Sequence, residues 1–157
     1  MAKSAVVYVT RTGHSKALAE AVAARLGVEA HEIVDLVPRK GSLGYFWAGG
    51  QASMGMASPI KDPEVDLAGA ESVVLVEPVW ASSVCPPLRT WLKAHKAELA
   101  GKKIALIASN LGSEGEPLKA KFEAEFGPLA AFACIHEKDI QPDKDAAIEA
   151  LCGAVER

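Results

Sequence analysis

Short runs of apolar, often β-branched residues alternate along the chain with longer stretches of helical periodicity, and this alternation limits the fold more than any other feature. The apolar runs predict five strands, at residues 5–10, 30–36, 72–77, 103–109 and 129–135. Sequence with apolar residues every three or four positions follows these runs and predicts helices. Strands that alternate with helices are typical of a parallel sheet with both faces covered. We therefore expect a three-layer α/β fold built on a five-stranded parallel sheet.

The predicted helices are bounded by glycine and proline, which commonly end or begin helices. They are expected at residues 15–26, at 88–99 after the pair Pro86-Pro87, at 117–126, and from Pro142 onward. His95 shares the apolar stripe of Trp91 and Leu99, so we expect a packed side chain rather than a ligand. Residues 41–58 predict a long, glycine-rich and partly helical connection, and residues 62–70 predict a turn or short helix.

Length and charge narrow the classes of protein that fit this pattern. The 157 residues suit a single domain spanning 1–157, because domains cluster at roughly 100–200 residues. Lys and Arg number 17 against 20 Asp and Glu, a formal net charge of −3. Nucleic-acid binding needs a basic face, so a polyanion partner is not expected.

Membrane, secretory and metal-binding functions are not predicted either. No apolar run approaches the roughly 18 residues of a membrane span. The first residues lack the apolar stretch of a signal peptide, so a cytoplasmic location is expected. Three cysteines without a CxxC pair favour neither a disulfide framework nor a zinc site. Cys134 and Cys152 lie on apolar faces and are expected to be core thiols.

The segment between the first predicted strand and helix carries the clearest functional signal. Its residues are Thr10, Arg11, Thr12, Gly13, His14 and Ser15. A tight turn there would gather backbone N–H groups and hydroxyls at a helix N-terminus, where the orphan amides and the helix dipole favour an anion. The glycine allows the backbone to bend. We predict a site for a terminal phosphate group.

A simpler interpretation of these residues stays open. A turn from a strand into a helix often carries Ser or Thr only to cap the helix. The segment matches neither Gly-x-x-x-x-Gly-Lys nor Gly-x-Gly-x-x-Gly, so nucleoside triphosphates and dinucleotides are poorly supported. A hydroxyl-rich turn without an obligatory lysine suits a monophosphate.

The motif Thr-x-Thr-Gly-x-Ser between a strand and an amphipathic helix resembles the FMN-phosphate loop of flavodoxins. Residues 78–89 resemble the segment of flavodoxin-like proteins that flanks the flavin, and residues 109–112 fall where their second flavin loop would lie. The resemblance extends over essentially the whole chain. It implies a doubly wound, flavodoxin-like sheet with strand order 2-1-3-4-5 and FMN across the carboxyl ends of the strands. That position agrees with the rule that such sheets bind ligands where the strand order switches.

The resemblance implies FMN as cofactor and extends the candidate site beyond the phosphate turn. Trp80 would stack on the flavin ring, although a tryptophan at the edge of the core is the alternative interpretation. The other candidates would contribute mainly backbone groups to the flavin's polar rim: Pro78, Val79, Ala81, Ser82, Ser109, Asn110 and Gly112. His14 stands where flavodoxins usually have Asn, and with Arg11 it would favour phosphate and raise the flavin's potential.

Three functions fit this site. The leading hypothesis is an electron carrier that serves redox partner proteins or a small electron acceptor, with no catalytic side chain and no metal. The alternatives are an FMN-dependent NAD(P)H:quinone or flavin reductase on the same fold, and an interaction module that has lost FMN. Residues 45–47 (Tyr-Phe-Trp) would cover the flavin ring, form a docking surface for a partner or quinone, or pin a long loop to the domain, and the last interpretation is favoured. Cys85 and Arg89 lie too close in sequence for the phosphate cradle of a cysteine phosphatase.

Overall fold

The fold is described here from a computed structural model. The structure describes residues 3–11, 13–36, 59–79, 83–110, 115–136, 138–139 and 141–157. The predicted connection at residues 41–58 lies outside these ranges.

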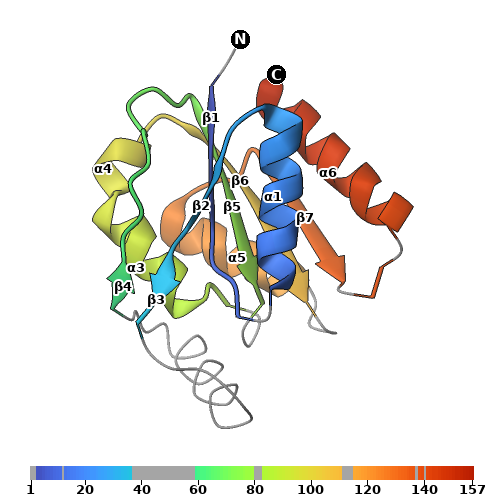
Figure 1. Cartoon of the computed structure of the whole chain (residues 1–157). Coiled ribbons are helices and arrows are strands. Elements are labelled where there is room, and N and C mark those ends of the chain that lie inside the picture. Colours follow the sequence, from blue (N-terminus) through green and yellow to red (C-terminus); the bar gives the residue numbers. More distant parts are fainter. Residues whose placement is uncertain are drawn as a thin grey trace, which may run out of the picture.

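A single five-stranded parallel sheet forms the middle layer (Figure 1). Its strands are β1 (Ser4–Tyr8), β2 (Ala30–Glu32), β5 (Ser72–Pro78), β6 (Lys103–Asn110) and β7 (Ala131–His136). They lie in the order β2-β1-β5-β6-β7, and every neighbouring pair is parallel. Because β3 and β4 belong to a separate small sheet, this is the predicted order 2-1-3-4-5. The predicted α/β fold class is confirmed.

Two helical layers cover the sheet, one on each face (Figure 1). Helices α1 (His14–Leu26) and α6 (Gln141–Glu156) pack over Val6, Val74 and Ile107. On the opposite face, α3 (Pro86–Ala94) and α5 (Gly115–Phe126) pack over Val7 and Leu75. Neighbouring strand residues point to opposite faces, so a continuous apolar run supplies both cores at once. This explains why the central strands show no alternation of polar and apolar residues.

The second predicted strand is shorter than expected because the chain leaves the main sheet at Ile33. This residue is 1% exposed, and its N–H donates to the Tyr8 carbonyl at 2.8 Å. Beyond it, β3 (Val34–Asp35) pairs antiparallel with β4 (Ile60–Lys61). The prediction of one strand over 30–36 is therefore wrong in its second half, which pairs with residues distant in sequence.

The predicted helix at 88–99 is interrupted at His95. The backbone there departs from helical geometry, with φ −108° and ψ 16°, and separates α3 from the short helix α4 (Lys96–Leu99). The His95 ring lies 4.9 Å from the Trp91 ring, as the expected packing requires. In residues 62–70 the structure contains a turn, in which the Gly69 N–H donates to Asp66 Oδ1 at 3.0 Å.

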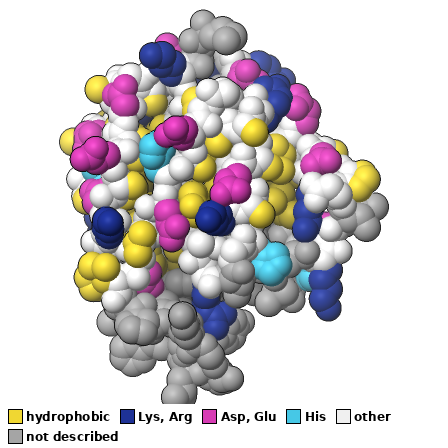
Figure 2. Space-filling view, viewed as in Figure 1, with side chains coloured by type: hydrophobic (Ala, Val, Ile, Leu, Met, Phe, Trp, Pro, Cys, Tyr) yellow, Lys and Arg dark blue, Asp and Glu magenta, His cyan; other side chains and the backbone are white. Residues whose placement is uncertain are grey.

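Three further features of the fold are the surface charges, the apolar length of the helices and the burial of the cysteines. Acidic and basic side chains lie interspersed on the face shown in Figure 2. No helix in the described ranges is long and apolar enough to cross a membrane. The three cysteines, all of which the structure describes, form no disulfide. Cys152 is buried as predicted, whereas Cys134 is partly exposed.

Candidate functional site

Three of the predicted site segments meet at one edge of the sheet. They follow β1, β5 and β6, which are neighbours in the sheet and end on the same side (Figure 1). Pro78 is paired in register with Ser109, and the Val79 N–H donates to the Ser109 carbonyl at 2.8 Å. This bond joins the start of the segment after β5 to the end of β6. The site candidates Thr12, Trp80, Ala81, Ser82 and Gly112 lie outside the described residues.

The predicted phosphate turn, residues 10–15, is shaped by Gly13. Its φ of +99° lies in the left-handed region that only glycine adopts without strain. Its N–H donates to Thr10 Oγ1 at 2.9 Å, and its carbonyl accepts the first helical bond of α1 from the Ala17 N–H at 3.1 Å. Thr10 therefore acts first as an acceptor that holds the turn, while its own hydroxyl proton stays available for a ligand.

The N-terminus of α1 retains the properties that favour an anion. Gly13 is the N-cap residue, no described side chain caps the helix, and the first turn contains no acidic residue. Thr10 and Ser15 thus do not act as the hydroxyl caps that the simpler interpretation of this turn requires. Arg11 is half-buried and His14 is exposed beside the turn, so the positive charge of Arg11 adds to that of the helix dipole.

A small cavity connects this turn with the end of β6. It has a volume of about 170 Å³ and lies between α1 and α6, lined by residues that include His14, Ser109, Gln141 and Lys144. Ser109 is 2% exposed, so its side chain belongs to the cavity wall rather than to the surface. The cavity places the predicted phosphate turn and the predicted second flavin segment beside one shared hollow.

Sequence reasoning assigned no role to Glu77, which lies directly before Pro78. Its side chain is fully buried on the α3 side of the sheet, and its Oε2 accepts the Cys85 N–H at 3.2 Å and the Cys85 Sγ–H at 3.3 Å. Burial raises the pKa of Glu77 to about 8, against the smaller lowering effects of the Cys85 hydrogen bonds and Arg89. A buried carboxyl group with a strongly raised pKa therefore lies under the candidate site.

Other polar side chains surround this carboxyl group. Arg89, also buried, forms an ion pair with Glu125 of α5 at 3.2 Å. Lys121, on the same helix, donates to Ser83 Oγ at 3.0 Å. We call Glu77, Ser83, Cys85, Arg89, Lys121 and Glu125 the buried polar cluster, after its buried members; Lys121 and Glu125 are exposed at its rim. Its contacts with α5 join residues 36 and 38 positions apart, which is why local patterns did not indicate it.

The Cys85 environment also excludes phosphatase chemistry. Burial, and then the Glu77 charge, raise the pKa of the Cys85 thiol well above its usual value. A nucleophilic cysteine requires the opposite shift, because the thiolate is the reactive form. In the described residues, no group of three or more His, Cys, Asp or Glu side chains could hold a metal ion.

Comparisons with known proteins agree with this architecture. No family model and no curated protein matches the chain. Among solved structures, a flavoprotein of Lactobacillus acidophilus NCFM in complex with FMN is 16% identical, with a TM-score of 0.76 over 96% of this chain and 99% of that one. A flavodoxin of Streptococcus pneumonia TIGR4 is 15% identical, with a TM-score of 0.58 over 99% of this chain and 98% of that one.

A short-chain flavodoxin associated with a bacterial microcompartment gives a third match. It is 16% identical, with a TM-score of 0.58 over 99% of this chain and 97% of that one. These similarities extend over nearly the full length of both compared chains, so they concern the whole domain. The chain is an α/β protein with a flavodoxin-like fold. The resemblance drawn from the sequence motifs is confirmed at the level of that fold.

Proposed function

We propose that this protein binds FMN at the carboxyl edge of the sheet and carries electrons between redox partners. The observation that carries the proposal is the uncapped N-terminus of α1 behind the turn at residues 10–15, at the point where the strand order switches. A similar fold in the Lactobacillus acidophilus flavoprotein is known in complex with FMN, which supports the choice of cofactor.

The residues of the turn suit the doubly charged phosphate of this cofactor. Backbone N–H groups of the first turn of α1 and the Arg11 guanidinium would bind phosphate oxygens, and the Thr10 hydroxyl would add a donor. The segments that begin at Val79 and end at Ser109 would border the flavin ring, with Trp80 as the stacking residue. FMN itself supplies the redox chemistry, and the chain supplies binding and electrostatic tuning.

Electron transfer, rather than catalysis on an organic substrate, fits the described residues best. Transfer of electrons by a bound flavin requires no side-chain acid, base or nucleophile, because the cofactor itself supplies the redox chemistry. The partners would be redox proteins or a small electron acceptor, in the cytoplasm. The alternative is an FMN-dependent NAD(P)H:quinone or flavin reductase. Rapid NADPH oxidation with a quinone would favour the reductase, and two resolved one-electron steps without NADPH turnover would favour the carrier.

A pair of glycine substitutions tests the binding site. Gly13→Ala and Gly27→Ala each place a Cβ at a left-handed φ, at the two ends of α1, with no atom within 4 Å of either Cβ. Each should lower stability by roughly 1–2 kcal/mol. Only Gly13→Ala should also weaken FMN binding, by about tenfold, because it alone distorts the phosphate turn.

Fluorescence titration of FMN into the apoprotein measures the loss of affinity, and urea unfolding measures the loss of stability in each variant. Equal FMN affinity in the two variants would remove the turn from the site. Failure of the unaltered protein to bind FMN, or to acquire the flavin absorbance when reconstituted, would overturn the proposed function as a whole.

A further inference from the structure

The position of Glu77 links the buried polar cluster to the candidate site. This residue precedes Pro78, where the predicted flavin-flanking segment begins, and its carboxylate binds Cys85, where that segment ends at α3. One side chain thus holds the two ends of the segment together. Its Oε2 takes both bonds from Cys85, whereas the buried Oε1 has no hydrogen-bond partner among the described residues.

The groups around Glu77 provide little compensation for a negative charge. Ala108 on β6 is the register partner of Glu77. On the other side, Val9 directly follows Tyr8, which pairs with Val76. Ala108 and Val9 both belong to the apolar core that contains Cys85. The thiol of Cys85 is held in its neutral form. The only cations in the cluster are Arg89 and Lys121.

Both cations of the cluster are already engaged. Arg89 is paired with Glu125, and Lys121 is bound to Ser83. Asp35 of β3 adds a further negative charge that acts on Cys85. A carboxylate in such surroundings is close to the balance between its charged and neutral forms.

Resting on the function proposed above, we infer that at alkaline pH Glu77 binds one proton when FMN at the site is reduced, and so couples the potential of the cofactor to pH. An electron supplied to bound FMN by a reduced redox partner would add negative charge at the sheet edge, where β5 ends one residue after Glu77. A solvent proton then binds the unpartnered Oε1 and restores the charge balance, while Oε2 keeps its bonds to Cys85. At Glu77 this step forms one Oε1–H bond and breaks no bond in the chain; the proton comes from solvent, and the electron stays on the cofactor.

The sign of the coupling defines the pH window. Below the Glu77 pKa of about 8 the carboxyl group is protonated in both redox states and contributes nothing to the pH dependence. Above it, the oxidised protein has an ionised Glu77, while the reduced protein retains the proton because negative charge nearby raises the pKa further. Reduction therefore takes up one extra proton at alkaline pH and becomes harder as the pH rises.

Spectroelectrochemistry of the FMN-loaded protein and of Glu77→Gln tests this inference. Gln reproduces the neutral form of the side chain. The FMN potentials of wild type and variant should therefore agree at pH 6 and diverge above pH 8. There the wild-type potential should fall by about 59 mV more per pH unit, one extra proton per electron. Glu71→Gln, which changes an exposed carboxylate beside the other end of β5, should retain the wild-type slope. Equal slopes in wild type and Glu77→Gln would overturn the inference and leave the proposed function intact.

A second measurement needs no variant. Infrared difference spectra of the wild-type protein at pH 9, reduced minus oxidised, should contain the C=O band of a newly protonated carboxyl group, shifted by labelling Glu with ¹³C. A spectrum without that band would contradict proton uptake even if Glu77→Gln did not fold. Failure of the wild-type protein to bind FMN would instead overturn the proposed function, and the inference with it.

Discussion

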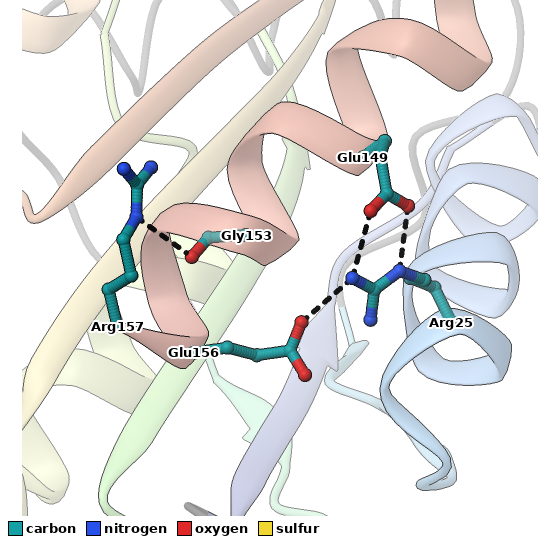
Figure 3. A network of polar contacts seen from close by, with 5 residues as sticks. All are labelled: Arg25, Glu149, Gly153, Glu156 and Arg157. Atoms are coloured by element: carbon teal, nitrogen blue, oxygen red, sulfur yellow. Dashed lines mark hydrogen bonds and ion pairs between the residues drawn. The ribbon is translucent and has the colours of Figure 1, made fainter.

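The two faces of the sheet handle charge in opposite ways. On the α1–α6 face, Arg25 bridges the two helices by binding Glu149 at 2.7 and 2.9 Å and Glu156 at 2.8 Å (Figure 3). These side chains are 34–63% exposed, and the core beneath them is apolar. On the α3–α5 face, Arg89 is 4% exposed and belongs to the buried polar cluster that also contains the fully buried Glu77.

The contrast indicates what each set of charges contributes. Exposed ion pairs add little to stability, because water and salt screen them and two long side chains must be ordered. Buried charges cost much desolvation energy, and well-packed apolar residues would often serve stability as well or better. Stability alone therefore does not explain the buried polar cluster. Its position directly under the predicted flavin-flanking segment supports a role in the function of the site.

Arg89→Met should produce the largest loss of stability, because it removes the guanidinium from the buried polar cluster and retains an apolar side chain of similar length. Glu77 loses the neighbouring positive charge and Glu125 loses its ion-pair partner. We expect a loss of about 2 kcal/mol in the free energy of unfolding, measured in urea, because the buried guanidinium loses its charged hydrogen bonds while Glu125 stays partly solvated. The double variant Arg89→Met/Glu125→Met should recover part of this loss. A single variant within about 1 kcal/mol of wild type would erase the contrast between the two faces.

His95 lies between Arg25 and Arg89 in side-chain exposure, and its contribution to stability depends on pH. Its ring is 19% exposed and binds Glu98 at 2.7 Å and Asp62 at 2.8 Å. Burial lowers the pKa of His95, but the hydrogen bonds to Glu98 and Asp62 outweigh burial and raise it overall. A raised pKa stabilises the fold below the unfolded value of about 6.5, and this contribution is lost as pH rises through the folded pKa.

His95→Gln should therefore destabilise the protein more at pH 6 than at pH 9. Urea midpoints of both proteins at the two pH values give the comparison. The advantage of wild type over the variant should shrink as the pH rises from 6 to 9. An equal difference at both pH values would show that packing against Trp91, rather than charge, is the main contribution of the ring.

Much of the fold could be predicted because its signals are local and repeated. The central strands β1, β5 and β6 are compact apolar runs, whereas the edge strand β2 (Ala-His-Glu) is short and polar. Glycine or proline marks most helix ends, as Gly27 and Gly127 do. The phosphate turn was also local: Gly13 has the left-handed φ that the turn requires. The residues between a strand and a helix thus determined both the turn and its place at the sheet edge.

The remaining features depend on contacts between residues distant in sequence. A glutamate at the end of a strand is normally expected at the surface; Glu77 is buried because Cys85 and α3 fold back over it. The second half of the predicted strand at 30–36 pairs with Ile60 and Lys61, a partner that no local pattern identifies. The break at His95 likewise coincides with its bond to Asp62, 33 positions earlier.

Arg25→Met should have the smallest effect, although Arg25 forms more close ion contacts than Arg89. The hydrogen bonds to Glu149 and Glu156 raise the pKa of Arg25, yet the guanidinium is charged at every working pH, so the shift adds nothing to stability near neutrality. Its partners remain solvated when it is removed, because both carboxylates are exposed. We expect an unchanged urea midpoint at 0.15 M salt, which screens such pairs. A loss as large as that of Arg89→Met would mean that the number of ion contacts, rather than their burial, determines the contribution of charge in this fold.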